Sequence, residues 1–280
     1  MWPDLKINRF KLFVFDVDGT ILQLHHELDP FTRSVLLNLK DMGFAITLAT
    51  GKNMKSTRMV AEKLQIELPI VLSNGCVLQS LDGTIHQKHY LSVDFLKQLI
   101  KECERMEIDL AIHIDEDIYV KKVTDNLSIL LDYGSPTLEE VGEWEALNGL
   151  FPKAYKCLVV DRYSREPLIE LENKMQSKVG DSVVYCHTLT EMLEFMPEGV
   201  SKLTGIRAIA EEMGISLQSV MAFGDGNNDA EMLEAVGFGA AVENATKLVK
   251  NCADWVVPSC ADNGPAQFLQ YLMKDRPSHN

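Results

Sequence analysis

Two aspartates separated by one residue follow an apolar run near the N-terminus. Asp16 and Asp18 come directly after residues 11–15 (KLFVF), which have the composition of a buried strand. Side chains i and i+2 of an extended segment face the same way, so both carboxylates could converge on one point. Crowded, partly buried carboxylates repel each other unless a cation or a shared proton compensates. The segment therefore predicts a divalent metal site or, as the plainer alternative, an Asp-Gly turn between two strands.

A second acidic segment, residues 224–229 (GDGNND), follows another apolar run. Asp225 comes directly after its predicted strand, as Asp16 does. Asn228 or Asp229 could instead cap the helix that follows, and for Asp229 taken singly the cap is the favoured interpretation. Oxygen ligands without paired histidine or cysteine favour magnesium over zinc. We therefore predict a Mg²⁺ ion between the two acidic segments.

A lysine and a threonine at other strand and helix ends suit an anionic ligand. Lys202 follows Ser201, a natural N-cap, and so lies in the first turn of a predicted helix. A cation there is unfavourable by about 0.3–1 kcal/mol when exposed, and a nearby anion would reverse the sign. The alternative is a solvated lysine. Thr50 and Gly51 follow the apolar run 44–49 and offer a hydroxyl and backbone N–H donors to phosphate oxygens.

The elements that must position these groups alternate between strand and helix. Asp29 is a predicted N-cap with proline in the first turn after it, and Gly43 is placed to end that helix. Short apolar strands at 44–49 and 70–72 flank a second amphipathic helix. This order is typical of a parallel sheet with crossover helices, in which ligands bind at the carboxyl ends of the strands. The polar strand ends are Asp16/Asp18, Thr50-Gly51, Ser73-Asn74 and Gly224-Asp225.

The alternation of predicted strands and helices changes after residue 74. The turn pairs Asn74-Gly75 and Asp82-Gly83 flank a short apolar run and indicate a hairpin. Further predicted helices lie near 92–106 and 164–178, and further strands near 108–121, 154–160, 182–186 and 191–196. Such a mixture indicates an α+β unit inserted into the α/β core, which resumes with a helix at 202–213 and strands near 220–223, 238–242 and 254–257.

Residues 111–120 alternate between apolar and polar side chains. The pattern puts Ile112 and Ile118 on one face and His113 and Tyr119 on the other. A substrate-facing strip is one interpretation. A solvated face, or an Asp-Glu-Asp turn in a hairpin, is the favoured one.

Five motifs, in order and spacing, resemble those of the haloacid dehalogenase superfamily. They are DVDGT at 16–20, ATGK at 49–52, SNG at 73–75, GVSK at 199–202 and GDGNNDAEM at 224–232. The Asn-Gly pair and the large insertion look like the Cof-type sugar-phosphate phosphatase branch, class IIB, with a C2 cap. The resemblance implies a Rossmann-like parallel-sheet core domain formed by 1–84 and 190–280, and an α+β C2-type cap domain at 85–189.

The resemblance also implies residue roles. Asp16 would attack phosphorus and form an aspartyl phosphate, and Asp18 would protonate the leaving alcohol and later activate water. Magnesium would be held by the carboxylates of Asp16 and Asp225 and by the backbone carbonyl of Asp18. The expected phosphate-binding groups are Thr50, Gly51, Lys202, Asn228 and the backbone of Val17. Asp229 would orient Lys202 or a metal-bound water.

The resemblance implies a phosphatase that acts on small phosphorylated metabolites, with sugar phosphates as the first choice. The alternatives are a phosphomutase on a similar core, a catalytically silent sensor of phosphorylated metabolites and, less favoured, a dehalogenase. Two positions depart from the usual motifs: Lys52 replaces an arginine, and Val17 replaces a leucine.

Composition excludes several classes. The chain has 280 residues and a formal net charge of −14, which argues against binding to nucleic acid or to anionic membranes. No stretch is long and apolar enough to span a membrane, and residues 1–10 lack the apolar region of a secretory signal. The six cysteines are scattered without a CxxC pair, so neither zinc nor disulfides are indicated. We expect a cytoplasmic protein that is a monomer or a homodimer.

Overall fold

The computed structural model describes residues 2–23, 27–132, 137–179 and 183–274. It divides into two compact units. The first unit comprises the described residues of Met1–Gly51, Thr57–His86 and Ser201–Asn280, and the second those of Lys52–Ser56 and Gln87–Val200. Within the described part of the chain, every helix is too short or too polar to cross a membrane.

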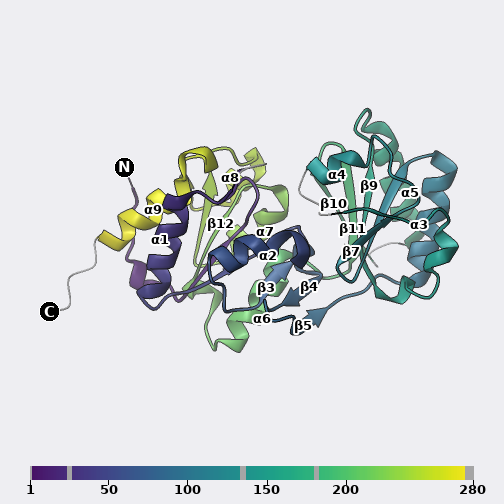
Figure 1. Ribbon diagram of the computed structural model, residues 1–280. Coiled ribbons are helices and arrows are strands. Elements are labelled where there is room, and N and C mark those ends of the chain that lie inside the picture. The colour runs from purple at the N-terminus through teal and green to yellow at the C-terminus, as the bar shows by residue number, and fades with distance from the viewer. Residues whose placement is uncertain (1, 24–26, 133–136, 180–182, 275–280) are drawn as a thin grey trace. The chain divides into compact units, whose positions relative to one another are not determined.

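The first unit is built on a parallel five-stranded sheet with the strand order β14-β13-β12-β1-β2. Its strands are β1 (Leu12–Phe15), β2 (Ala45–Leu48), β12 (Val220–Gly224), β13 (Phe238–Val242) and β14 (Trp255–Val257). Its helices include α1 (Pro30–Asp41), α6 (Lys202–Glu212), α7 (Ala230–Ala235), α8 (Lys247–Cys252) and α9 (Gly264–Lys274). Figure 1 shows helices on both sides of this sheet, with α1 and α9 on one side and α7 on the other. The predicted α/β fold class is confirmed.

The strand order reverses between β1 and β12. Strand β1 continues along the chain to β2 on one side, whereas its other neighbour, β12, lies more than 200 residues further on, with Leu12 opposite Val220. In open parallel sheets such a reversal opens a crevice at the carboxyl ends of the two strands. Asp16 and Asp225 follow the last residues of β1 and β12, so the topology delivers both to this crevice.

The predicted helix boundaries are confirmed where capping residues defined them. The Asp29 carboxylate accepts hydrogen bonds from the backbone N–H groups of Phe31 and Thr32, which would otherwise lack partners at the start of α1. After α1 the chain turns at Gly43, whose φ of 86° lies in the left-handed region that glycine tolerates. Local side-chain chemistry is therefore sufficient to place α1.

The hairpin predicted around Asn74-Gly75 is also present. Strands β3 (Ile70–Leu72) and β4 (Val77–Gln79) pair antiparallel, with Leu72 opposite Val77, and β5 (Ile85–Lys88) completes a three-stranded sheet. An isolated parallel bridge between Ala49 and Val71 places β3 beside the end of β2. This bridge brings the polar ends of β2 and β3 together.

The second unit is an α+β sandwich on a six-stranded sheet with the order β10-β11-β9-β6-β7-β8. Its strands are β6 (Asp109–Ile114), β7 (Asp117–Val120), β8 (Glu139–Glu140), β9 (Ala154–Val160), β10 (Val183–Leu189) and β11 (Met192–Pro197). Helices α3 (Val93–Met106) and α5 (Glu166–Val179) lie along one face of the sheet, as Figure 1 shows. The short helix α4 (Ser128–Asp132) contributes Ile129 and Leu130 to a smaller apolar cluster that includes Ile118 and Val120.

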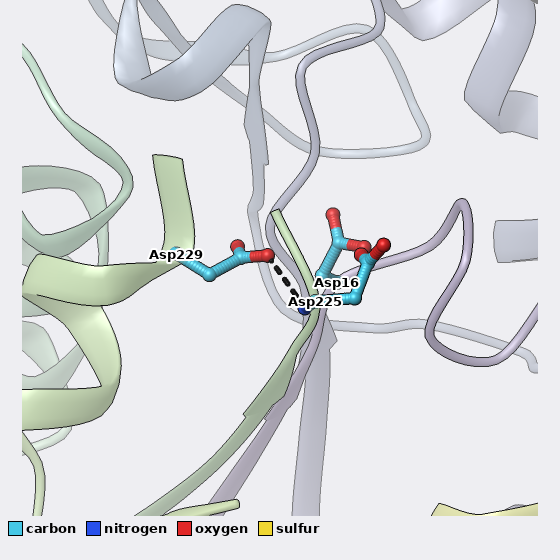
Figure 2. A group of neighbouring side chains, drawn as sticks. All are labelled: Asp16, Asp225 and Asp229. Carbon is cyan, nitrogen blue, oxygen red and sulfur yellow. Dashed lines mark hydrogen bonds between the residues drawn. The ribbon is translucent and has the colours of Figure 1, made fainter. Parts of the chain in front are cut away.

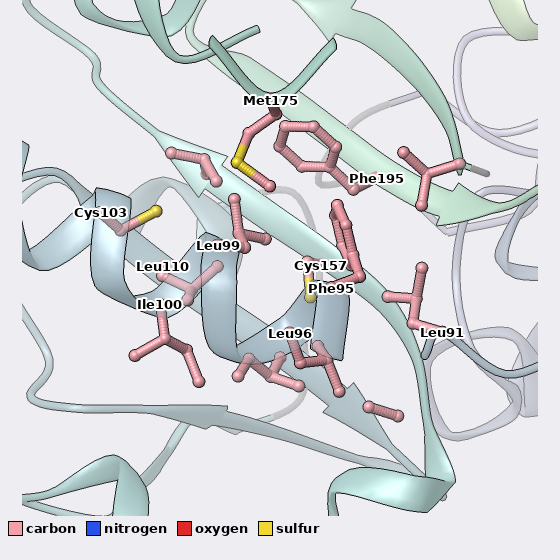
Figure 3. Close-up of a cluster of buried hydrophobic side chains, with 14 of the residues drawn as sticks. Leu91, Phe95, Leu96, Leu99, Ile100, Cys103, Leu110, Cys157, Met175 and Phe195 are labelled. Atoms are coloured by element: carbon pink, nitrogen blue, oxygen red, sulfur yellow. The ribbon is translucent and has the colours of Figure 1, made fainter. Parts of the chain in front are cut away.

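The larger apolar cluster of the second unit lies between α3 and the sheet. Figure 3 shows Phe95, Leu96 and Leu99 of α3 in this cluster together with Phe195 and Cys157 of the strands. Burial of one such side chain contributes about 1.5–3 kcal/mol, so this cluster is large enough to hold α3 and α5 on the sheet.

The prediction that residues 111–120 alternate between two faces as one continuous strand is wrong. The chain reverses between Ile114 and Asp117, so His113 pairs with Ile118 and shares its face. Tyr119 instead packs with the cluster that contains Ile112. His113 is consequently buried rather than solvated, with 4% of its surface exposed. Of the interpretations offered for this segment, the hairpin is the one that forms.

The division between the units differs from the predicted domain boundaries. It falls after Val200, whereas the sequence placed the second boundary at 189/190. Strand β11 pairs antiparallel with both β10 and β9, so a boundary at 190 would separate paired strands of one sheet. The interpretation of the two units as a catalytic core and a cap remains a proposal.

Candidate active site

Three carboxylates gather where β1 and β12 end. One oxygen from each of Asp16, Asp225 and Asp229 lies within 4.8 Å of the others. Figure 2 shows Asp16 and Asp225 side by side at the ends of their strands and Asp229 reaching in from the neighbouring helical turn. Asp16 is 5% exposed and Asp229 fully buried, so water compensates little of this negative charge.

A buried ammonium group separates two of these carboxylates. Lys202 Nζ donates to Asp16 Oδ1 and to Asp229 Oδ1, each at 2.6 Å, and Lys202 is 1% exposed. The alternative of a solvated lysine is excluded. Ser201 caps α6 by accepting from the Thr204 N–H, which fixes the first turn that carries Lys202.

Asp229 holds the second acidic loop together. Its Oδ2 accepts from the backbone N–H groups of Asp225, at 3.0 Å, and Gly226, at 2.9 Å. It makes no side-chain cap to α7, so its favoured interpretation as a simple helix cap is wrong. Gly224 permits this packing, because a Cβ there would lie 2.6 Å from Asp229 Cβ. Asp229 therefore orients both Lys202 and the Asp225 backbone.

Gly19 and Thr20 fix Asp225 from the first acidic loop. Gly19 has a φ of 81°, and a Cβ on it would lie 2.4 Å from Asp225 Oδ2. Thr20 Oγ1 donates to Asp225 Oδ1 at 3.1 Å. From the sequence, Gly19 was expected only to permit the sharp turn of the chain, and Thr20 was assigned no role. The available signal was their place in the DVDGT motif, where the aspartates alone suggested chemistry.

The electrostatics of the group are compatible with a bound divalent cation. Burial raises the pKa of Asp225 to about 8, and the carboxylates of Asp16 and Asp229 add to the rise. Burial also raises the pKa of Asp229 to about 6, against the lowering effect of Lys202. Burial would lower the pKa of Lys202, but its two carboxylate partners outweigh this and raise it well above its ordinary value. Three carboxylates facing one ammonium retain net negative charge, and their hard oxygen donors fit a divalent cation such as Mg²⁺.

Asp18 lies outside the carboxylate group. The group contains Asp16, Asp225 and Asp229, and the Asp18 carboxylate is not one of its members. The chain bends sharply after Val17, whose carbonyl accepts from the N–H groups of Ile21 and Leu22, and a lone bridge joins Asp18 to Leu22. The half-buried Asp18 thus leaves the direction of β1. The alternative of a hairpin after β1 is also excluded, because both neighbours of β1 are parallel.

The remaining predicted residues meet through an asparagine. The Asn74 N–H donates to the Thr50 carbonyl at 2.9 Å, and Asn228 Nδ2 donates to Asn74 Oδ1 at 2.8 Å. A Cβ on Gly51 would lie 3.2 Å from Asn74 Oδ1. The structure thus brings Thr50, Gly51 and Asn228 around Asn74, which the sequence had marked only as a polar strand end.

Asn244 forms an outer layer of the site. Its Nδ2 donates to the Gly19 carbonyl and its Oδ1 accepts from the Cys260 N–H, both at 2.8 Å. The N–H of Thr246 donates to the Asp225 carbonyl at 3.0 Å. The loop after β13 therefore supports both acidic loops, which no local sequence pattern had indicated.

Comparison with known proteins agrees with this geometry. A family described as haloacid dehalogenase-like hydrolase matches residues 13–269. The chain is 27% identical to HMP-PP phosphatase of Yersinia enterocolitica over 275 residues, which cover 94% of this chain and 96% of that one.

Solved structures share the fold. A haloacid dehalogenase-like hydrolase from Bacteroides thetaiotaomicron superposes with a TM-score of 0.85 at 22% identity, covering 94% of this chain and 99% of that one. The HAD subclass IIB sugar phosphatase BT4131 superposes with a TM-score of 0.81 at 21% identity, with coverage of 94% and 99%. The resemblance identified from the five motifs is confirmed by the match over most of the chain. The prediction of a hydrolase is confirmed with it, since the chain belongs to the haloacid dehalogenase-like hydrolase family.

Proposed function

We propose that this protein is a magnesium-dependent phosphatase of small phosphorylated metabolites and that Asp16 is its nucleophile. The observation that carries the proposal is the position of Lys202, buried at 2.6 Å from both Asp16 and Asp229. An ammonium group has three N–H donors, and two are used by these carboxylates. The third is available to a phosphoryl oxygen next to the Asp16 carboxylate.

Two steps would complete the reaction. In the first, an Asp16 oxygen bonds to phosphorus, the bond to the leaving oxygen breaks, and Asp18 gives that oxygen its proton. In the second, Asp18 takes a proton from a water molecule whose oxygen attacks phosphorus. The bond between phosphorus and Asp16 then breaks, which frees inorganic phosphate and regenerates Asp16.

The other groups align the phosphoryl group. Thr50, Gly51, Asn228 and the backbone of Val17 would donate to its oxygens, because phosphoryl transfer depends mainly on positioning and charge neutralisation. When bound, Mg²⁺ would be held by the carboxylates of Asp16 and Asp225 and the carbonyl of Asp18, and it would supply positive charge to the phosphoryl oxygens.

The substrate class follows from the relatives taken together. One is named for HMP-PP and another for sugar phosphates, so a small phosphorylated metabolite is the shared feature. We place sugar phosphates first, because the Cof-type motifs indicate them.

A phosphate-release assay over hexose and pentose phosphates, nucleotides, pyridoxal phosphate and flavin mononucleotide tests the proposal. We expect release with Mg²⁺, none after chelation, and none from Asp16→Asn. The matched control is Asp82→Asn, which changes an exposed aspartate of another Asp-Gly turn in the same unit and should retain activity.

Three outcomes would contradict the proposal. Full activity of Asp16→Asn would show that Asp16 is not the nucleophile. An isomeric phosphate ester in place of inorganic phosphate would indicate a phosphomutase. Saturable binding across the panel without turnover would indicate a sensor.

A further inference from the structure

The turn at residues 73–75 touches each segment that carries a proposed phosphate-binding side chain. Its Asn74 contacts the Thr50-Gly51 loop through the Thr50 carbonyl and Asn228 through the side-chain amides. Its Gly75 lies against α6, because a Cβ on Gly75 would be 2.1 Å from the carbonyl oxygen of Ser201, the residue before Lys202. Residues from three distant parts of the sequence therefore depend on one short turn.

The backbone of this turn is strained. Ser73, Asn74 and Gly75 have φ values of 49°, 58° and 97°, all in the left-handed region. A serine there is uncommon, and such conformations persist only where their surroundings impose them. The Ser73 hydroxyl is fully buried and has no hydrogen-bond partner in the described part of the chain. The turn is thus a poor choice for stability alone, which points to a functional constraint on its shape.

The contact with Asn74 determines which way the Asn228 amide points. Asn228 Nδ2 lies 2.8 Å from Asn74 Oδ1, while Asn228 Oδ1 is on the side of Gly226, where a Cβ would approach it to 2.5 Å. A flip of the amide would set its oxygen against Asn74 Oδ1 and lose the bond. One N–H of Asn228 is used by Asn74, and under the proposed function the other would donate to a phosphoryl oxygen.

We propose that Asn74 is a positioning residue for phosphoryl binding, which acts by fixing the amide of Asn228. The inference rests on the proposed function, since it deepens the assignment of Asn228 as a phosphate ligand. The main chain of Asn74 is anchored by its N–H bond to the Thr50 carbonyl, and its side chain packs against Gly51, which has no Cβ. The oxygen that accepts from the Asn228 amide is therefore held from two sides.

A double-mutant cycle on inorganic phosphate affinity tests this inference. Asn74→Gly keeps the left-handed backbone and removes the side chain that carries the acceptor. We expect it to weaken phosphate binding, measured by calorimetry with Mg²⁺, about tenfold, the size of one hydrogen bond. In an Asn228→Ala background the same change should have no further effect. A structural role alone would give equal losses in both backgrounds, and that result would overturn the inference.

Two further variants keep the test decisive. Asn74→Asp retains both the backbone preference and the acceptor, so replacing Asn228 by alanine should weaken phosphate binding as much in this variant as in the unchanged protein. Asn263→Gly is the matched control, because Asn263 also has a left-handed backbone (φ 57°) and accepts from a helix side chain, Thr32, at 2.9 Å. It should leave phosphate affinity unchanged.

Failure of this inference can be distinguished from failure of the proposed function. If the unchanged protein binds phosphate but hydrolyses no ester, the proposed phosphatase function is refuted, and the double-mutant cycle still decides the role of Asn74. A protein that binds no phosphate would overturn both. An active phosphatase with additive losses in the cycle would overturn only the role of Asn74.

Discussion

Lys202 Nζ lies 2.6 Å from Asp16 Oδ1, and both side chains are buried, at 1% and 7% exposure. The two residues are 186 positions apart in the sequence. The bond engages one oxygen of Asp16, the proposed nucleophile. It also means that the proposed nucleophile carries its own counter-charge before any ligand binds.

Removal of that counter-charge should affect both stability and turnover. Lys202→Met leaves two buried carboxylates without their shared cation, and breaking such a pair costs about 3–5 kcal/mol. Urea unfolding should show this loss, and phosphate release should fall below detection. The control is Arg207→Met on the exposed face of the same helix. Normal turnover by a folded Lys202→Met protein would contradict the assigned role.

Gly19 should be irreplaceable for a steric reason and not only for its backbone angle. In Gly19→Ala the new Cβ would meet Asp225 Oδ2 at 2.4 Å, in addition to the strain of a φ of 81°. Gly83→Ala is the matched control, since its φ is 95° but no atom lies within 4 Å of the new Cβ. Both variants should lose about 1–2 kcal/mol of unfolding free energy from backbone strain. Only Gly19→Ala should lose activity, and equal activities would show that the Asp225 contact is dispensable.

Thr20 should tune metal affinity through Asp225. Thr20→Val keeps the shape and removes the donor to Asp225 Oδ1. Loss of such an outer hydrogen bond typically weakens metal binding about 10–100-fold. A Mg²⁺ titration of phosphate release should therefore shift to higher concentration, and Thr20→Ser should restore it. An unshifted titration would mean that Asp225 does not need this bond.

Asp18, the proposed general acid and base, has a distinctive test. If it activates water, Asp18→Asn should still react with an ester whose leaving group needs no proton, such as a nitrophenyl phosphate, but should then stall. The aspartyl phosphate at Asp16 would accumulate and could be reduced with borohydride and located by mass spectrometry. An Asp18→Asn enzyme that turns over such an ester normally would exclude Asp18 as the base.

His113 should make the protein sensitive to acid. Burial lowers the pKa of His113 well below 6.5, and the charge of Lys156 lowers it further. The native state therefore stays neutral at this ring while the unfolded state takes up a proton below 6.5, so stability is lost as the pH falls below that value. Urea unfolding between about pH 7.5 and pH 5.5 should show a smaller loss for His113→Phe than for the unchanged protein.

The control for this pH prediction is His89→Phe. His89 lies on the surface of the same unit, so its replacement should leave the acid dependence as it was. Identical pH profiles for His113→Phe and the unchanged protein would show that other groups cause the acid sensitivity.

Much of the fold could be predicted because its signals are local. The N-caps Asp29 and Ser201 satisfy backbone donors two or three residues away, and the turn at Asn74-Gly75 forces β4 to pair with β3. The prediction failed where one turn decides the register of the next strand. The reversal between Ile114 and Asp117 moved Tyr119 to the opposite face from His113, which a simple alternation cannot anticipate.

The sequence by itself determined that carboxylates, a threonine, a lysine and asparagines stand at strand and helix ends, because short-range periodicity and capping place such ends. Only the tertiary structure decided which of them touch. It put Lys202 between Asp16 and Asp229, left Asp18 out of that group and joined Asn74 to Asn228 across 154 residues. Such contacts depend on the packing of whole elements and on single missing Cβ atoms, neither of which leaves a periodic trace along the chain.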